Sequence, residues 1–363
     1  MGAIPMFNHT TRRIPIPILR DYMVRLLEAV GVDGETAATV AGLHLESDLR
    51  GVGVQGFNHL INSHLQDFMS GRCDPKGKPE IVKDGPCYAL IDGHAGTGPI
   101  AALFAVDVAV KKAKAAGCAV VGITNSFDLF QAGLYADRIA AHDLVGMVYS
   151  DDVVPVVHPL GGVEPVIGSN PVAWAVPTAR DPFVLDFAPC ATLPTYVRYT
   201  QRYGGRLPEG VAHDAEGRPT TDPFKVTNGA SHTGAIGAIA PLGNKGYGLL
   251  LMIDFLSGAL VGADMGLAHV NKKGSRKGHL FIAIDPAIFG DTAAFKSAVS
   301  ARIDEIKRSK PAPGMGEIRV PGEGSYARRA ENLASGTVEI DGVCWEDGLK
   351  MGRTLGVELP VVP

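Results

Sequence analysis

The middle of the chain alternates between strand-like and helix-like segments, and this alternation restricts the fold more than any other feature of the sequence. Short apolar runs at residues 88–91, 119–124 and 145–149 are typical of buried strands. An amphipathic stretch rich in Ala, Val and Lys at residues 100–116 predicts a helix between the first two runs, and another helix is expected to end near His142. Alternation of this kind predicts an α/β domain.

The apolar runs that follow indicate a sheet that is not purely parallel. Residues 172–176 and 183–185 are separated by Pro and Gly, which favours antiparallel or mixed pairing. The nearest glycine-rich run, at residues 92–98, lacks the G-x-G-x-x-G spacing and the acidic residue about 20 positions later that mark a Rossmann dinucleotide fold. A Rossmann fold is therefore disfavoured.

Helical segments are expected at both ends of this α/β region. Apolar residues recur at helical spacing over residues 18–69, and Asp33 is the expected N-cap of the second helix there. We expect a helical N-terminal region at residues 1–84 that packs with residues 310–363. The α/β cofactor-binding domain is then expected at residues 85–309.

The second half of the chain contains a candidate lid. Residues 203–237 are rich in Gly, Pro and charge, which predicts a long excursion on the surface or over a ligand. The most apolar stretch, at residues 248–262, is shorter than the ~20 residues that cross a bilayer and contains Asp254, so we interpret residues 247–260 as a buried helix. A strand at residues 279–284 and a charged helix at residues 292–309 are expected to follow.

Charge and cysteine content argue against several classes of function. The net charge of −4 arises from 34 basic and 38 acidic residues that are mixed along the chain, so electrostatics give no reason to expect nucleic acid or a membrane as partner. The five cysteines are widely spaced and form no C-x-x-C pair, which indicates neither a disulfide framework nor a zinc knuckle. We expect a soluble cytoplasmic protein that acts on small molecules.

The sequence indicates neither a metal site nor a hydrolase triad. The histidines do not occur at the spacing of a metal-binding motif. Ser126 and Ser169 lack the G-x-S-x-G sequence of a nucleophile elbow.

A series of short segments lies in a consistent order along the chain. The segments are D-L-R-G-V (48–52), V-G-I-T-N-S (121–126), A-G-L-Y (132–135), P-L-G-G (159–162), G-S-N-P (168–171), V-L-D-F-A (184–188), L-P-E-G (207–210), T-T-D-P (220–223), P-L-G-N-K-G-Y-G (241–248) and V-P-G-E (320–323). In this order they resemble the malate/L-lactate dehydrogenase family. The resemblance implies an α/β fold with a non-Rossmann, largely antiparallel sheet, an NAD or NADP cofactor, and a homodimer with its active site near the subunit boundary.

The same resemblance places the cofactor-binding residues at a strand end, a turn and a loop. In this chain those positions are Asp186, Phe187, Ala188 and Cys190, then Gly322, Glu323 and Gly324, and finally Asp152. Two neighbouring positions depart from the family pattern: Pro189 lacks a backbone N–H, and Cys190 replaces a hydroxyl. The structural alternatives are a strand-end cap for Asp186, a simple turn at Gly322 and a solvated loop acid at Asp152.

The histidines that relatives use for proton transfer are absent. Relatives place Ser-His-Gly where this chain has Val54-Gln55-Gly56, and His-Phe-Gly where it has Asp128-Leu129-Phe130. Gln55 therefore occupies a catalytic position but cannot exchange a proton near neutral pH. The candidate donors are Asp128 if burial raises its pKa, Tyr196, and His59, because imidazole exchanges protons near neutrality. Asp128 could instead be a solvated loop acid or a helix N-cap, and His59 a packing histidine.

Substrate binding is expected from Arg50, His59 and Ser169. Arg50 matches the family and either holds an anionic group or braces a helix through charged hydrogen bonds. His59 replaces an arginine of several relatives, and Ser169 either touches substrate or is a turn residue.

These observations favour an NAD(P)-dependent oxidoreductase that interconverts a small keto or imino compound and its hydroxy or amino form, with an atypical proton donor. The alternative is a catalytically silent family member that binds a nucleotide or metabolite as a regulatory or partner subunit.

Overall fold

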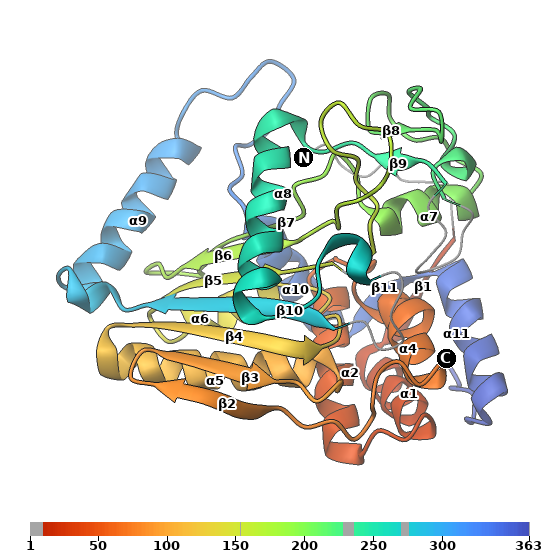
Figure 1. The fold of residues 1–363 in the computed structure, drawn as a ribbon, viewed down its shortest axis with the longest axis horizontal. Coiled ribbons are helices and arrows are strands. Elements are labelled where there is room, and N and C mark those ends of the chain that lie inside the picture. The colour runs from red at the N-terminus through yellow and green to blue at the C-terminus, as the bar shows by residue number, and fades with distance from the viewer. Residues whose placement is uncertain (1–9, 153, 228–235, 270–275, 363) are drawn as a thin grey trace.

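The computed structural model describes residues 10–152, 154–227, 236–269 and 276–362. Figure 1 shows a sheet with helices on both faces and, beside it, a group of helices formed by both ends of the chain. None of the helices in these described ranges is long and apolar enough to cross a membrane.

A seven-stranded mixed sheet forms the centre of the α/β region. The strand order is β2-β3-β4-β10-β5-β6-β7, and only the β3–β4 pair is parallel, which confirms the mixed, largely antiparallel sheet. The strands are β2 (Glu80–Gly85), β3 (Tyr88–Asp92), β4 (Cys118–Ser126), β5 (Val145–Ser150), β6 (Val172–Val176), β7 (Phe183–Phe187) and β10 (Lys277–Ile284).

Helices cover the two faces of this sheet. In Figure 1, α8 (Gly243–Ser257) lies in front of the sheet, and α5 (Gly98–Ala116) and α6 (Gly133–Ala140) lie behind it. The alanines of α5 pack with apolar side chains of β4 and β10 in one core cluster. Small side chains let the helix approach the strands closely, so the Ala-rich sequence of α5 accounts for its position.

The helical region is closed by the two ends of the chain. Strand β1 (Thr11–Pro15) pairs with β11 (Thr337–Asp341), and the side chains of Tyr22, Phe57 and Trp345 meet in a second core. The helices are α1 (Ile16–Ala29), α2 (Gly34–Leu49), α3 (Phe57–His59), α4 (Leu65–Met69), α10 (Glu323–Ser335) and α11 (Gly342–Leu355), with a π-helical turn at Leu60–His64.

Local sequence signals explain several element boundaries. Asp33 accepts a hydrogen bond from Thr36 N at 3.1 Å and caps α2, as predicted. Strand β2 belongs to the sheet, so the change from helices to sheet lies before Glu80 rather than at residue 85. The apolar helix at residues 247–260 begins four residues earlier, at Gly243, and ends at Ser257.

The remaining elements lie in and around the candidate lid. Within residues 203–237, positions 228–235 fall outside the described residues, and the described part pairs β8 (Ala212–His213) with β9 (Ala238–Ile239). The other elements are α7 (Pro194–Arg202), α9 (Thr292–Lys307) and short 3₁₀ turns at Pro223–Lys225, Ala259–Val261, Gly266–His269 and Pro286–Ile288.

Candidate functional site

The turn that follows β4 carries Asp128 in a constrained backbone. Asn125 and Phe130 both have a φ of 53°, in the left-handed region that non-glycine residues rarely adopt. The side chain of Asn125 donates to Asp92 Oδ1 at 2.7 Å, and Phe130 N donates to Asp128 Oδ1 at 2.9 Å. Backbone strain of this kind gathers at functional sites, where the surroundings hold it in place.

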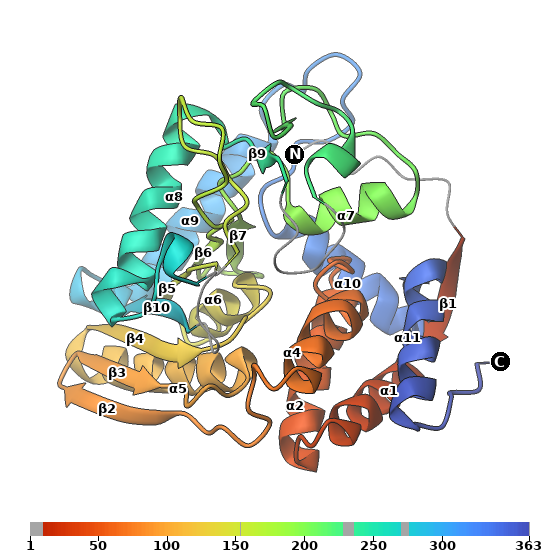
Figure 2. The same ribbon diagram turned by 45° about the vertical axis from the view of Figure 1, so that its right-hand side comes forward.

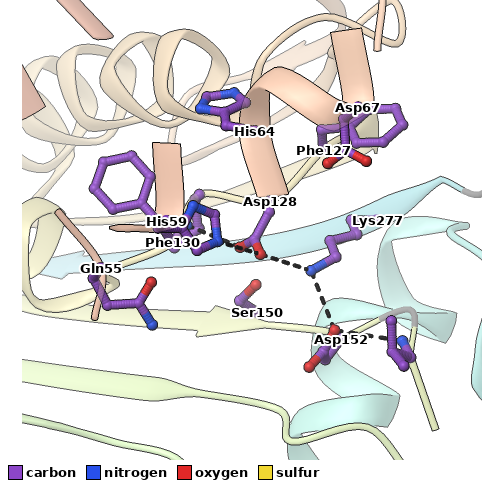
Figure 3. A network of polar contacts seen from close by, with 12 residues as sticks. Gln55, His59, His64, Asp67, Phe127, Asp128, Phe130, Ser150, Asp152 and Lys277 are labelled. Carbon is purple, nitrogen blue, oxygen red and sulfur yellow. Dashed lines mark hydrogen bonds and ion pairs between the residues drawn. The ribbon is translucent and has the colours of Figure 1, made fainter. Parts of the chain in front are cut away.

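Asp128 contacts a lysine and a histidine from distant parts of the chain. Its Oδ2 lies 3.4 Å from Lys277 Nζ and 3.4 Å from His59 Nε2. Figure 3 shows these three side chains, from the β4 turn, the start of β10 and α3, pointing toward one another. Lys277 Nζ also lies 3.3 Å from Asp152, whose other oxygen accepts a hydrogen bond from Ser169 at 2.6 Å. The structure therefore links four residues predicted from sequence through one lysine.

The charges in this network make Asp128 a carboxylate. Burial alone would raise its pKa, but Lys277 and then His59 outweigh that effect and hold the pKa well below its ordinary value. The pKa of Lys277 is raised despite burial, because Asp128 and Asp152 favour its charged form. Our expectation that burial would raise the pKa of Asp128 and make it the acid is therefore corrected: the nearby lysine has the opposite effect.

A chain of buried imidazoles lies beside this network. His44 Nδ1 lies 3.0 Å from the Gln55 carbonyl, His44 Nε2 lies 3.1 Å from His64 Nδ1, and His64 Nε2 lies 2.8 Å from the Thr97 hydroxyl. Burial lowers the pKa of His44 well below its usual range and that of His64 to about 3, so both rings are neutral. The Gln55 carbonyl can only accept, so His44 donates to it through Nδ1 and accepts at Nε2 from His64 Nδ1. His64 Nε2 then accepts from the Thr97 hydroxyl.

This histidine chain supports the residues around His59. The His44 ring stacks on Phe130 with 4.2 Å between centroids and lies 5.8 Å from the His59 ring. Gln55 is thus held through its backbone carbonyl, and its side-chain Oε1 is buried with no hydrogen-bond partner in the described part of the chain. His59 Nδ1 is also buried without a hydrogen-bond partner in the described part of the chain. Both atoms are therefore closed off from solvent.

A further buried histidine fixes the turn from the sheet side. His279 Nε2 donates to the Phe127 carbonyl at 3.0 Å, which leaves Nδ1 to accept from Ser150 at 2.9 Å. Burial lowers the pKa of His279 to about 4, so this ring is neutral. Because β10 carries both Lys277 and His279, one strand holds the backbone of the turn and the carboxylate that the turn presents.

His59 lines a pocket of about 360 Å³ between the α3 region and α7. The lining residues are Val54, Asn58, His59, Asn62, Ser63, Thr195, Arg198, Tyr199, Gln201, Arg202 and Phe224. The pocket can therefore place a small polar molecule against an imidazole that is bonded to a carboxylate.

Two other predicted residues lie away from this network. The Arg50 guanidinium donates to Glu46 and to Asp137, both at 2.7 Å, and its carbon lies 5.1 Å from the centroid of the Tyr326 ring. These contacts match the bracing alternative for Arg50. Tyr196 is buried in the apolar cluster under α7 and does not line the pocket, so its placement gives no support to a proton-donor role.

The predicted cofactor residues at the strand end are held by internal contacts. Asp186 Oδ2 accepts from Gly133 N at 3.0 Å at the start of α6, and burial raises the pKa of Asp186 to about 6. Phe187 packs edge-on against Trp174, whereas Ala188 and Cys190 are buried in the cluster under α7. Burial raises the pKa of the Cys190 thiol to about 12.

The strand end and the glycine turn converge, as the cofactor prediction requires. Gly322 has a φ of 89°, and a Cβ on it would lie 3.0 Å from Val184 N, two residues before Asp186. A Cβ on Gly324 would meet no described atom within 4 Å, so the first turn of α10 borders open space. Glu323 forms an ion pair with Lys307.

Comparison with known proteins assigns the family. The sequence model described as malate/L-lactate dehydrogenase matches residues 14–347. Malate dehydrogenase of Pyrococcus horikoshii is 35% identical over 95% of this chain and 96% of its own length. L-sulfolactate dehydrogenase of Methanocaldococcus jannaschii is 36% identical over 83% of this chain and 86% of its own length. The chain belongs to the malate/L-lactate dehydrogenase family.

Solved structures agree with this assignment. The P. horikoshii malate dehydrogenase structure has a TM-score of 0.85 at 31% identity and covers 96% of this chain and 97% of its own. The δ1-piperideine-2-carboxylate reductase structure from Pseudomonas syringae has a TM-score of 0.80 at 26% identity and covers 94% of this chain and 100% of its own. Family members are NAD(P)-dependent dehydrogenases and reductases, so the predicted family, fold and enzyme class are confirmed.

Sequence reasoning missed three residues of this candidate site. Lys277 lies in the basic run K-K-G-S-R-K, which looks like a solvated loop, and the strand was expected to begin only at His279. Strand periodicity places residues 277 and 279 on the same face, which was the available signal. His44 and His64 are 20 residues apart and gave no signal, because a helix pair with ligand spacing would need them three or four apart.

Proposed function

We propose that this protein is an NAD(P)-dependent oxidoreductase that interconverts a small 2-oxo or imino acid and its 2-hydroxy or amino form, with His59 as the proton-exchanging group. The observation that carries the proposal is the His59–Asp128–Lys277 contact in the wall of a pocket. The names of the relatives support the substrate class, since they include malate and L-sulfolactate dehydrogenases and a cyclic imino acid reductase.

The geometry assigns a role to each ring nitrogen of His59. Nε2–H donates to the Asp128 carboxylate, which leaves Nδ1 to exchange a proton with substrate. In the reducing direction, a side-chain movement exposes the buried Nδ1, and protonated His59 then gives its Nδ1 proton to the carbonyl oxygen or imine nitrogen. The Asp128 charge stabilises the imidazolium before that transfer. Lys277 keeps Asp128 ionised throughout, so Asp128 and Lys277 act as positioning residues.

The backbone at residues 322–324 and the end of β7 are the best candidates for holding the cofactor. Gly322 approaches Val184 closely, and the space beside Gly324 leaves room for a ligand at the start of α10. When bound there, the reduced nicotinamide supplies the hydride. The proposed contacts are those of Asp186, Phe187, Ala188, Cys190, Gly322, Glu323 and Gly324, with Asp152 and Ser169 on the side of Lys277.

The direct test is oxidation of NADH and NADPH, followed at 340 nm, with a panel of 2-oxo acids and cyclic imines. We expect turnover with at least one acid. Replacing His59→Gln should then lower kcat about 10²- to 10⁴-fold and remove an ionisation from the pH profile, whereas exposed His142→Gln should match wild type. Retention of full activity and pH profile by the His59 variant would exclude the imidazole as donor.

Two contacts favour the second candidate, a silent member that binds nucleotide or metabolite. The carboxylates of Asp186 and Glu323 already have partners within the chain, so both have a structural role that does not require a cofactor. Saturable NADH binding without turnover of any compound in the panel would support this candidate over the first.

We also propose a homodimer. Met252 and Phe255 on α8 are about half exposed, and Leu260 just after α8 is 63% exposed, which suits a surface that another subunit covers. Light scattering coupled to size exclusion should give twice the 38.1 kDa chain mass, and a monomer at micromolar concentration would contradict the proposal.

A further inference from the structure

We propose that Arg198 and Arg202 of α7 anchor the carboxylate of the substrate in the pocket beside His59 and thereby determine specificity for acids. This inference rests on the proposed function, because it names the groups that would hold the substrate of that same site. It also commits to a chemical class: the substrate carries its reducible carbon next to a carboxylate.

The charge of the pocket wall is the first observation. Two guanidinium groups and one imidazole line the pocket, and none of the described residues that line it is a carboxylate. The other side chains are largely amides and hydroxyls, including Asn58, Asn62 and Gln201, which can hydrogen bond an anion without repelling it. A concave site with this composition attracts a small anion.

The second observation is how the other nearby cations are used. Arg50 is bonded to Glu46 and Asp137, Arg72 to Asp67, and Lys277 to Asp128 and Asp152. Each therefore has its charge matched by carboxylates of the chain. Arg202 is likewise paired with Asp347, and what distinguishes Arg198 and Arg202 among the cations described around His59 is that both line the pocket itself.

The two arginines are also close enough to affect each other. Burial and then the neighbouring charge of Arg202 lower the pKa of Arg198, against an opposing effect of Asp152. Arg202 is held 3.0 Å from Asp347 on α11, which fixes one guanidinium against the helical region. A carboxylate between two like charges relieves their repulsion, and a guanidinium pair binds it through several N–H donors.

The position of the pocket connects this anchor to the chemistry. One wall comes from Val54 to Ser63, around His59, and the facing wall comes from Thr195 to Arg202 on α7. Figure 2 shows α7 above the helical region that supplies the first wall. A 2-oxo acid whose carboxylate binds α7 presents the adjacent carbonyl oxygen toward the imidazole, because these groups are on neighbouring carbons.

The first test separates binding from chemistry by using oxalate, a dianion of the right size that cannot be reduced. Oxalate should bind the wild type by isothermal titration, and Arg198→Gln should weaken its Kd about 10- to 100-fold. Arg302→Gln, on exposed α9, is the matched control and should leave the Kd unchanged. Equal oxalate affinity in the Arg198 variant and the wild type would overturn the inference.

Steady-state kinetics provide the second readout. With an acid that the enzyme reduces, Arg198→Gln should raise KM about 10- to 100-fold with a smaller change in kcat, and Arg198→Lys should recover part of the loss. If turnover occurs and KM is unchanged in Arg198→Gln, the inference fails while the proposed function stands. If oxalate binding depends on Arg198 but no compound in the panel is reduced, the anchor stands and the proposed function fails.

Discussion

Two aspartates of the site region have opposite surroundings. Asp48, at the end of α2, is 5% exposed; its Oδ2 accepts from Phe57 N at 2.9 Å, and no described partner contacts its Oδ1. Asp128 keeps 35% of its side chain exposed and lies between Lys277 and His59. Burial raises the pKa of Asp48 well above its usual range, whereas Lys277 and His59 hold the pKa of Asp128 well below it.

The difference shows that a carboxyl here keeps its charge where a lysine and a histidine oppose the effect of burial, and loses that support where burial acts without them. Asp48 belongs to the D-L-R-G-V segment on which the family resemblance rests, and its carboxyl, whose neutral form burial favours, ties α2 to the start of α3. Asp128 stands where the sequence resemblance predicts a histidine, and it acts as a fixed negative charge.

The largest expected effect comes from crowding Asp48. A Cβ on Gly56 would lie 2.0 Å from Asp48 Oδ1, so Gly56→Ala must displace the carboxyl that caps Phe57. We expect a loss of about 3 kcal/mol in the free energy of unfolding, measured with urea at pH 7. Gly42→Ala, where a Cβ meets no described atom within 4 Å, is the control and should be neutral or stabilising by up to about 1 kcal/mol.

Removing the cation beside Asp128 should make it resemble Asp48. Lys277→Met leaves Asp128 and Asp152 without their shared lysine, and we expect a loss of about 2–3 kcal/mol at pH 7. This expected loss is smaller than that for breaking a fully buried ion pair, because water screens the exposed part of Asp128.

The pH dependence of the stability of this variant tests whether charge causes the loss. A depressed pKa means that Asp128 stabilises the wild type above its ordinary pKa, and this contribution is lost as pH falls through the lower folded value. In Lys277→Met the lysine no longer opposes burial, so the pKa of Asp128 rises and the variant takes up a proton at higher pH than the wild type. The stability gap between wild type and Lys277→Met should therefore shrink when unfolding is repeated below pH 4, and a gap of equal size at pH 7 and pH 3.5 would show that charge is not its cause.

Asp186 provides an intermediate case. Burial raises its pKa to about 6, so the folded protein binds this proton more tightly than the unfolded chain does. The contribution of this proton to folding stability is complete below the ordinary pKa of aspartate and is lost as pH rises through about 6. Asp186→Asn should be more stable than wild type by up to about 2 kcal/mol at pH 8, with the gap closing near pH 4. Thermal unfolding at the two pH values measures this, and a pH-independent difference would contradict it.

The smallest effect is expected for Asp48→Asn. Burial raises the pKa of the wild-type carboxyl and so favours its neutral form, and an amide oxygen can still accept from Phe57 N, so stability should change by less than about 1 kcal/mol. Because the pKa is raised, the wild type loses stability as pH rises through the folded value, and the variant should gain stability relative to the wild type as pH rises. A large loss at pH 7 would mean that Asp48 is ionised, which would remove the contrast with Asp128.

Much of the fold could be predicted, because its elements carry local signals. The strand at residues 172–176 and the cap at Asp33 follow from patterns within a few residues, and the structure has both. The strand at residues 279–284 begins two residues earlier, at Lys277, because pairing with β4 and β5 extends it beyond its apolar run. Tertiary pairing of this kind has no local sequence signature.

The site could be predicted only in part, for a related reason. Asp128 and His59 were identified by the family positions they occupy or adjoin, and the structure places them in contact. The protonation of Asp128 depends on Lys277, which follows it by more than a hundred residues, so its surroundings could not be read from its own segment. The strain at Asn125 and Phe130 likewise appears only once the turn is built.

The position of β10 has a consequence for how the molecule is made. This strand lies between β4 and β5, and its His279 bonds to Ser150 across 129 residues of chain. On the ribosome, β4 and β5 therefore emerge long before the strand that joins them, with their inner edges unpaired. We expect the nascent chain to remain vulnerable to aggregation, and its proton-exchanging centre to be absent, until the late strand inserts and brings Lys277 into place.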